Sequence, residues 1–224
     1  MKFGILQFPG SCDDRDAVSA ARRVGDAELL WHGERDLRGA DAIIVPGGFS
    51  YGDYLRAGAI ARFSPVMDAV AAFAEGGGIV LGICNGFQVL CEARLLPGAL
   101  LGNLNRRFTF RQLQLQVANA DTAFTRTCTE GERLSIPAKH AWGRYYAAEE
   151  TLQALERSGQ VLLRYAPGHN FNGSAHDIAG VMNEAGNVFG LMPHPEHAVD
   201  PLTGSSDGLK LFESMRLSVE GVRA

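Results

Sequence analysis

Cysteine is scarce in this sequence. The 224 residues include four cysteines, and no two of them form a CxxC pair. Disulfide frameworks and structural zinc sites both rely on paired cysteines, so we expect reduced thiols and a cytoplasmic location. The four residues are Cys12, Cys84, Cys91 and Cys128.

Basic clusters and long apolar runs are also missing. No apolar stretch approaches the roughly 20 residues of a membrane span, and Met1 leads into an expected strand rather than a signal peptide. Lysine and arginine total 21 against 25 aspartates and glutamates, with no cluster that would mark a phosphate-binding surface. Repeats and low-complexity linkers are absent too. We therefore expect residues 1–224 to form one globular domain that binds neither nucleic acid nor a membrane.

Segment 76–93 has the most informative pattern in the chain. Residues 79–83 (IVLGI) are apolar and rich in β-branched side chains, which predicts a strand buried on both faces of a parallel sheet. A helix is expected to follow at once, because the residues at i, i+3 and i+4 from Phe87 are apolar and form an inward stripe. Gln88 is expected on another face of that helix.

Residues 82–86 (GICNG) join this strand to this helix. They form a G-x-C-x-G version of the sharp elbow that exposes a nucleophile at the carboxyl edge of an α/β sheet, and the glycines leave room for the turn. A helix N-terminus also offers unpaired N–H groups that stabilise a thiolate or an oxyanion. Cys84 is therefore a candidate nucleophile. The alternative is that it is a small buried side chain, like most free cysteines.

The remaining patterns predict an α/β fold with a mixed sheet. Residues 108–117 alternate apolar and polar side chains, which indicates antiparallel strands with one solvated face added to a parallel core. The expected strands are 2–8, 27–31, 42–45, 79–83, 108–117, 134–138, 145–147, 161–165, 178–182 and 187–191. The expected helices are one capped by Asp13 or Asp14 with Val18, Ala21 and Val24 facing inward, then 65–75, the elbow helix, 149–158 and 206–219.

A glycine-rich loop, residues 46–53 (PGGFSYGD), follows the strand at 42–45. Glycine lets a substrate approach main-chain N–H groups, and open α/β sheets bind ligands at this edge, so we favour a binding loop over a plain turn. The loop lacks the lysine of a phosphate-binding loop and the spacing of a dinucleotide fingerprint. No nucleotide site is therefore assigned to it.

A cysteine nucleophile needs a base, and the base needs an orienting group. His194 follows an apolar strand within the run PHPE, where the prolines predict an extended backbone. Residues i and i+2 then share a side, so Glu196 can hold one imidazole nitrogen and leave the other for the thiol. A metal site with His197 is the alternative, but it needs a helical turn that prolines discourage. Three further histidines are expected at the surface or, in the polar loop, as surface or substrate contacts: His32, His169 and His176.

Together these motifs resemble the class I, or triad, glutamine amidotransferases. The elbow extends to G-x-C-x-G-x-Q at Gln88 and is paired with the late H-P-E. Longer runs look like the small glutaminase subunits of phosphoribosylformylglycinamidine synthases. They occur in order along the whole chain at residues 46–63, 82–90, 95–100 and 172–196.

The resemblance implies a flavodoxin-like α/β fold, with a mostly parallel central sheet flanked by helices and extended by antiparallel strands. It also implies a glutaminase reaction. Cys84 would attack the side-chain amide of glutamine, His194 would carry the proton to the departing ammonia, and Glu196 would hold His194. The resulting glutamyl thioester would then be hydrolysed.

The same resemblance implies further roles and partners. The N–H groups of Asn85 and Gly48 would form the oxyanion hole, and Gln88 would contact the substrate, although a solvated polar role fits Gln88 nearly as well. Ammonia would pass to a large ATP-dependent synthetase, often joined by a small third subunit. This chain would then bind no cofactor or metal itself, and ATP and Mg would serve the synthetase.

Three places depart from the family pattern. Residues 9–14 read PGSCDD where P-G-S-N-C-D is usual, residues 140–143 read HAWG where H-G-E-G is typical, and His197 replaces an arginine. These changes bear on substrate orientation and docking rather than on the triad.

Two other functions stay open at this point. One is a stand-alone cysteine hydrolase or stress protein of similar fold, which would not need the glycine loop together with H-P-E. The other is a catalytically inactive binding module. The intact Cys84, His194 and Glu196 argue against it.

Overall fold

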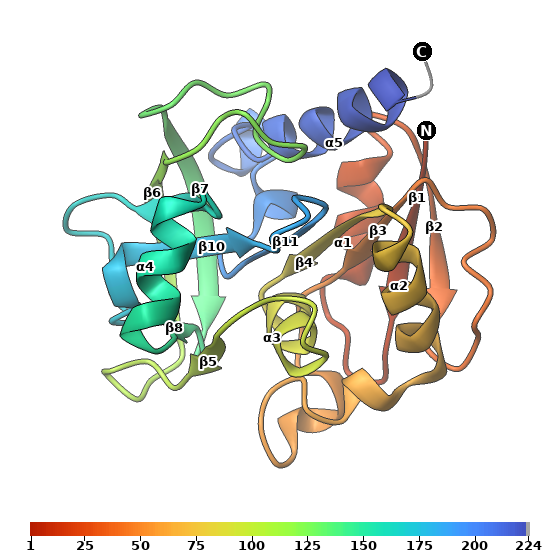
Figure 1. Ribbon diagram of the computed structural model, residues 1–224, viewed down its shortest axis with the longest axis horizontal. Helices are drawn as coiled ribbons and strands as arrows, with labels where there is room; N and C mark the ends of the chain where they lie inside the picture. The colour runs from red at the N-terminus through yellow and green to blue at the C-terminus, as the bar shows by residue number, and fades with distance from the viewer. Residues whose placement is uncertain (223–224) are drawn as a thin grey trace.

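Nine strands form one mixed sheet in the computed structural model, which describes residues 1–222 (Figure 1). The last two residues of the expected domain lie outside the described part. In sheet order the strands are Asp26–Trp31 (β2), Lys2–Gln7 (β1), Ala42–Val45 (β3), Ile79–Ile83 (β4), Val188–Leu191 (β11), Ile178–Met182 (β10), Val161–Tyr165 (β9), Thr109–Val117 (β6) and Arg133–His140 (β7).

The first five strands of this order are parallel to one another. Every residue of β3, β4 and β11 is buried, as expected for short apolar runs covered by helices on both faces. The order β2-β1-β3-β4-β11 is the flavodoxin-like doubly wound arrangement. The predicted fold class is confirmed.

Antiparallel strands extend the sheet on the far side of β11. From β11 through β10, β9 and β6 to β7, each strand is antiparallel to its neighbour. Strand β6 buries Leu113, Leu115 and Val117, while the intervening glutamines face outward. The prediction for 145–147 is partly wrong. Arg144–Tyr146 (β8) pairs with Ala99–Leu101 (β5) in a separate two-stranded ribbon, and β5 was not expected.

Helices cover both faces of the parallel strands. The crossovers through α1 and α2 lead in opposite directions along the sheet, and right-handed connections therefore place these helices on opposite faces. Helix α5 touches α1, α3 packs on β3, β4 and β11, and α4 covers the antiparallel part (Figure 1). The helices are Asp14–Ala21 (α1), Pro65–Glu75 (α2), Asn85–Glu92 (α3), Glu149–Arg157 (α4) and Leu209–Val222 (α5).

Three helix predictions need correction. Helix α1 buries Ala21 as predicted, together with Ala17 and Ala20, whereas Val18 is only half-buried and Val24 lies beyond the end of the helix. Asp13 occupies the N-cap position without making a side-chain cap bond. Helix α5 begins at Leu209 rather than residue 206, because the Asp207 carboxylate accepts the Ser135 N–H in β7 instead of capping the helix.

The carboxyl ends of the parallel strands meet at one edge of the sheet. Strand β1 leads into loop 9–13, β3 into loop 46–53, β4 into Cys84, and β11 toward His194. Strand β7 runs in the same direction as β11, so it delivers Lys139 to this edge as well. Within the described residues, no helix is long and apolar enough to cross a membrane.

Candidate active site

The strand-to-helix elbow holds Cys84 in an unfavourable backbone conformation. Cys84 lies at the N-cap of α3 with φ 50° and ψ −104°, and such strain in a non-glycine residue costs on the order of 1–3 kcal/mol. A Cβ on Gly86 would lie 1.8 Å from the Val45 carbonyl oxygen, and one on Gly82 would lie 2.5 Å from Leu90. The prediction that both glycines are needed for the turn is confirmed.

Two backbone carbonyls fix the position of Cys84. Its N–H donates to the Leu191 carbonyl at 2.8 Å, and its thiol lies 3.9 Å from the Lys139 carbonyl oxygen. The side chain is 6% exposed. The thiol therefore lies between β11 and β7, at the edge where the parallel strands end.

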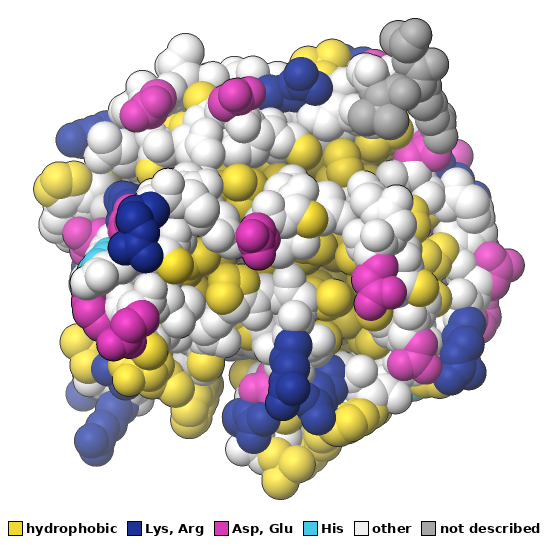
Figure 2. Space-filling model, viewed as in Figure 1, with side chains coloured by type: hydrophobic (Ala, Val, Ile, Leu, Met, Phe, Trp, Pro, Cys, Tyr) yellow, Lys and Arg dark blue, Asp and Glu magenta, His cyan; other side chains and the backbone are white. Residues whose placement is uncertain are grey.

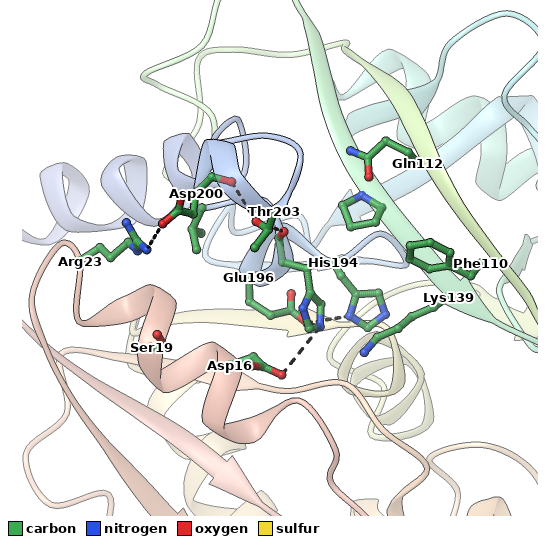
Figure 3. Close-up of a pocket in the computed structure, with 13 residues that line it drawn as sticks. Asp16, Ser19, Arg23, Phe110, Gln112, Lys139, His194, Glu196, Asp200 and Thr203 are labelled. Atoms are coloured by element: carbon green, nitrogen blue, oxygen red, sulfur yellow. Dashed lines mark hydrogen bonds and ion pairs between the residues drawn. The ribbon is translucent and has the colours of Figure 1, made fainter.

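His194 and Glu196 form the predicted pair. Nδ1 of His194 lies 2.6 Å from Oε1 of Glu196, and both side chains are almost fully buried (Figure 3). The other imidazole nitrogen, Nε2, is buried without a hydrogen-bond partner among the described residues, which leaves it for the thiol. The predicted division of labour between the two nitrogens matches this geometry.

The backbone of this segment differs from the prediction. Pro195–His197 forms one turn of 3-10 helix rather than an extended run, and the His194 N–H donates to the Pro137 carbonyl at 2.7 Å. Proline restricts φ but leaves ψ to tertiary contacts. The turn still brings the Glu196 carboxylate to His194, so the pair forms by a different local route.

The electrostatic surroundings favour a charged His194. Burial lowers the pKa of this imidazole, but the negative charges of the Glu196 carboxylate and of a Cys84 thiolate outweigh burial and raise it to about 10. His194 is therefore protonated at neutral pH. In this form it can donate a proton to a departing amine.

The glycine loop lies directly against the loop that follows β1. Gly48 has φ +144°, and a Cβ there would lie 2.6 Å from the Gly10 carbonyl oxygen and 2.7 Å from the Cys12 nitrogen. Phe49 N–H donates to the Gly10 carbonyl, and Cys12 N–H donates to the Gly47 carbonyl. This close approach explains why glycine is required.

Two backbone N–H groups at this edge of the sheet have no hydrogen-bond acceptor within residues 1–222. No hydrogen bond from Gly48 N–H is found within residues 1–222, and Asn85 N–H lies in the first turn of α3, where no intrahelical acceptor exists. Their role as an oxyanion hole stays a prediction, and this geometry is compatible with it.

Comparison with known proteins identifies the family. A family model described as CobB/CobQ-like glutamine amidotransferase domain matches residues 1–216. The chain belongs to this family of glutamine amidotransferases. The class I resemblance seen in the motifs is thereby confirmed.

Individual relatives of this amidotransferase are similar over almost their whole length. Phosphoribosylformylglycinamidine synthase subunit PurQ of Rubrobacter xylanophilus is 56% identical over 216 residues, 96% of this chain and 97% of the relative. The protein of the same name from Salinibacter ruber is 54% identical over 232 residues, with coverage of 100% and 99%. A chain of the PurLQS structure from Thermotoga maritima superposes with a TM-score of 0.88 at 43% identity, covering 96% of each chain.

Gln88 is buried in this amidotransferase, which rules out the alternative that it is a solvated polar residue. It is 5% exposed; its Oε1 accepts from Asn85 Nδ2 at 2.8 Å, and its Nε2 donates to the Trp142 carbonyl. Asn85 in turn accepts from the Ser50 N–H at 3.0 Å. These bonds tie the elbow to the glycine loop and to residues 140–143. Substrate contact by Gln88 stays a prediction.

The three further histidines make their contacts outside the His194–Glu196 pair. His32 is only partly exposed and its Nδ1 lies 2.8 Å from the Tyr51 hydroxyl, so it supports the glycine loop rather than lying free at the surface. His169 accepts the Gln114 N–H through Nδ1, and His176 lies beside Glu156. For these last two, the contacts favour structural roles.

Asp13 and Lys139 were missed as site residues by sequence reasoning. Their side chains meet at 2.5 Å, and His197 joins them with its Nε2 3.3 Å from Asp13. The two aspartates after β1 were a usable signal, since they stand at the carboxyl edge. Nothing in the sequence distinguished Lys139, which reaches the site through the unforeseen length of β7.

The same cluster bears on the metal alternative. Asp13, His194, Glu196 and His197 offer potential ligand atoms that all lie within 4.8 Å of one another. The backbone argument against a metal fails, because a helical turn does form there. The Lys139 ammonium, however, already supplies a positive charge to Asp13. The contacts therefore favour an ion-pair network.

Proposed function

We propose that this chain is the cytoplasmic glutaminase subunit of a phosphoribosylformylglycinamidine synthase. It hydrolyses L-glutamine to glutamate and ammonia and supplies the ammonia for amidation of formylglycinamide ribonucleotide in purine biosynthesis. The observation that carries the proposal is the 56% identity to a synthase subunit over 96% of this chain. The nucleophile elbow and the buried His194–Glu196 pair supply the chemistry.

The geometry fits a thioester mechanism. The proton of Cys84 lies on Nε2 of His194 before the attack, and the sulfur attacks the amide carbon of glutamine as the thiolate. The N–H groups of Gly48 and Asn85 bind the oxyanion, each donor contributing about 10²- to 10³-fold in rate. His194 then protonates the amide nitrogen, the C–N bond breaks, and ammonia leaves. Water, deprotonated by His194, cleaves the thioester to glutamate and restores the thiol.

The synthetase partner supplies the ATP chemistry in this proposal. A large ATP- and Mg-dependent subunit uses the ammonia, a small third subunit joins the complex, and this chain holds no cofactor. The similar Thermotoga maritima chain belongs to a structure titled PurLQS, which supports an assembly of this kind.

A projecting loop offers a docking surface for this partner. Apolar side chains stand out from the loop between β3 and α2, where Tyr54 is 74%, Leu55 91% and Phe63 72% exposed. Figure 2 shows apolar and basic side chains gathered on the projection at the lower edge of the molecule. The loop also contains Tyr51 and Asp53 at positive φ, so it stores strain that docking can release or redirect.

Glutamine hydrolysis with and without the synthetase tests the proposal. We expect slow release of glutamate from the chain alone and severalfold stimulation by the synthetase, because docking orders the loop that presents Gly48. A stand-alone hydrolase would instead turn over glutamine at the same rate in both samples. An inactive binding module would release no glutamate in either.

A further inference from the structure

Asp13 is buried, yet its carboxylate does not serve the helix that it precedes. It is 3% exposed at the N-cap of α1 and makes no capping bond. Its Oδ1 lies 2.5 Å from Lys139 Nζ and 3.3 Å from His197 Nε2. Its Oδ2 lies 3.6 Å from Nδ1 of His194. The side chain is therefore oriented toward the catalytic histidine.

Gly47 makes this approach possible. A Cβ at Gly47 would lie 2.4 Å from Oδ2 of Asp13 and 2.9 Å from Cε1 of His194. The Asp13 N–H also donates to the Gly47 carbonyl at 3.2 Å. The loops after β1 and β3 thus leave a space that is filled by the Asp13 carboxylate and the His194 ring together.

The charges around Asp13 are balanced. Burial raises the pKa of its carboxyl, but the His197 bond, the His194 charge and Lys139 outweigh burial and hold the pKa well below the usual range. Lys139 also acts electrostatically on Glu196 and Cys84. Nδ1 of His194 therefore faces the carboxylates of Glu196 and Asp13, and the Lys139 ammonium balances the negative charge of Asp13. The cluster borders a cavity of about 450 Å³ (Figure 3).

We propose that Asp13 is a positioning residue for the glutaminase reaction: a second carboxylate on the Nδ1 side of His194 that holds the imidazole toward Cys84, with Lys139 as its counter-charge. The role in glutamine hydrolysis rests on the proposed function, whereas the contacts of Asp13 with His194 and Lys139 do not depend on it. Two departures from the family pattern, in residues 9–14 and at His197, meet in this network.

Several ionisable groups face His194, and the test must separate Asp13 from the others. They come from the start of α1, from β7, from the elbow and from the turn after β11: Asp13, Lys139, His140, Cys84, Glu196 and His197.

The pH dependence of Cys84 alkylation by iodoacetamide measures the effect directly and needs no glutaminase activity. A Cys12→Ser background removes the exposed thiol, and burial raises the pKa of Cys128 to about 11 and that of Cys91 further, so these two react slowly. Asp13→Asn removes a negative charge beside the pair. We expect the alkylation midpoint to move down by about one pH unit.

Asp14→Asn is the matched control. Asp14 is also buried, but its carboxylate accepts from Gln7 and from the Arg15 N–H, away from His194. We expect a midpoint within about 0.3 units of the parent for this variant. Lys139→Met removes the counter-charge and should move the midpoint up. The double variant Asp13→Asn with Lys139→Met should return close to the parent.

Three outcomes overturn the inference. They are an unmoved midpoint in folded Asp13→Asn, equal shifts in Asp13→Asn and Asp14→Asn, and a Lys139→Met shift in the same direction as Asp13→Asn. The pH profile of kcat/KM for glutamine should follow the alkylation shifts. If the variants show those alkylation shifts but the parent does not hydrolyse glutamine, the inferred network holds and the proposed function fails instead.

Discussion

In the proposed mechanism, His194 is the side chain that both accepts and returns a proton, so the groups around it matter most. Glu196 holds Nδ1 at 2.6 Å in a fully buried contact. The second carboxylate, Asp13, lies 1 Å farther away and is shared with Lys139. At the residue scale, Glu196 is therefore the stronger influence and Asp13 a smaller correction to it.

Glu196→Gln should lower glutamine turnover less than His194→Ala does. The amide keeps the size and some hydrogen bonding of the carboxylate, whereas His194→Ala removes the proton carrier. Because Glu196 is a main cause of the raised pKa of His194, the alkaline limb of the pH profile should also move to lower pH. Steady-state kinetics from pH 6 to 10 check both points. An equal or larger loss for Glu196→Gln would mean that Glu196 acts on the substrate itself.

The same pair predicts how stability depends on pH. A folded-state pKa raised to about 10 contributes stability that is fully present below the unfolded pKa of about 6.5 and is lost as pH rises toward 10. The difference in melting temperature between the wild type and Glu196→Gln should therefore be largest near pH 6 and shrink toward pH 10. A difference that grows with pH would contradict the assignment of the charge to His194.

At the scale of elements, the elbow between β4 and α3 constrains the chain most tightly. Gly86→Ala would place a methyl group against the Val45 carbonyl and should destabilise the fold by about 1–3 kcal/mol or more. Gly76→Ala is the control, because Gly76 has φ −75° and the nearest atoms to a Cβ there are 3.5 Å away. Urea unfolding should show a change within about 0.5 kcal/mol for this control. Similar losses in both variants would mean that the elbow is not specially constrained.

The elements that sequence predicted well are those fixed by local pattern. Strand β4, helix α2 and the hairpin of β10 and β11 follow from apolar runs and proline or glycine punctuation, and they have the expected limits to within a residue. The elbow followed from its glycines. The pairing of His194 with Glu196 also followed from their spacing, although through the wrong backbone conformation.

The elements that sequence missed depend on distant contacts. Asp13 and Asp207 have side chains that typically cap helices. The Asp13 carboxylate instead accepts from the Lys139 ammonium, and the Asp207 carboxylate accepts from the Ser135 N–H. Lys139 is 126 positions from Asp13 in the chain, so no local pattern could pair them. The 3-10 turn at Pro195–His197 was missed for the same reason, since the Pro137 carbonyl helps to set it.

In the whole molecule, Cys84, the His194–Glu196 pair and the glycine loop lie at one edge of the sheet. The exposed apolar loop between β3 and α2 contacts α3 through Gly58, where a Cβ would lie 2.7 Å from the Val89 nitrogen. A partner that binds this loop can therefore act on the elbow helix and on Gly48 together. This arrangement fits an enzyme whose product is used by another subunit.

Cys84→Ala in the assembled synthase separates the production of ammonia from its use. The change removes the proposed nucleophile but few packing atoms, so the variant should fold and assemble, and glutamine-dependent synthesis of the amidine should fall by about 10³-fold or more. Synthesis from added ammonium salt should continue at the wild-type rate, since the synthetase is intact. Glutamine-dependent synthesis within tenfold of wild type would rule out Cys84 as the nucleophile, and failure of both routes in a complex shown to be assembled would rule out a separate ammonia supply by this chain.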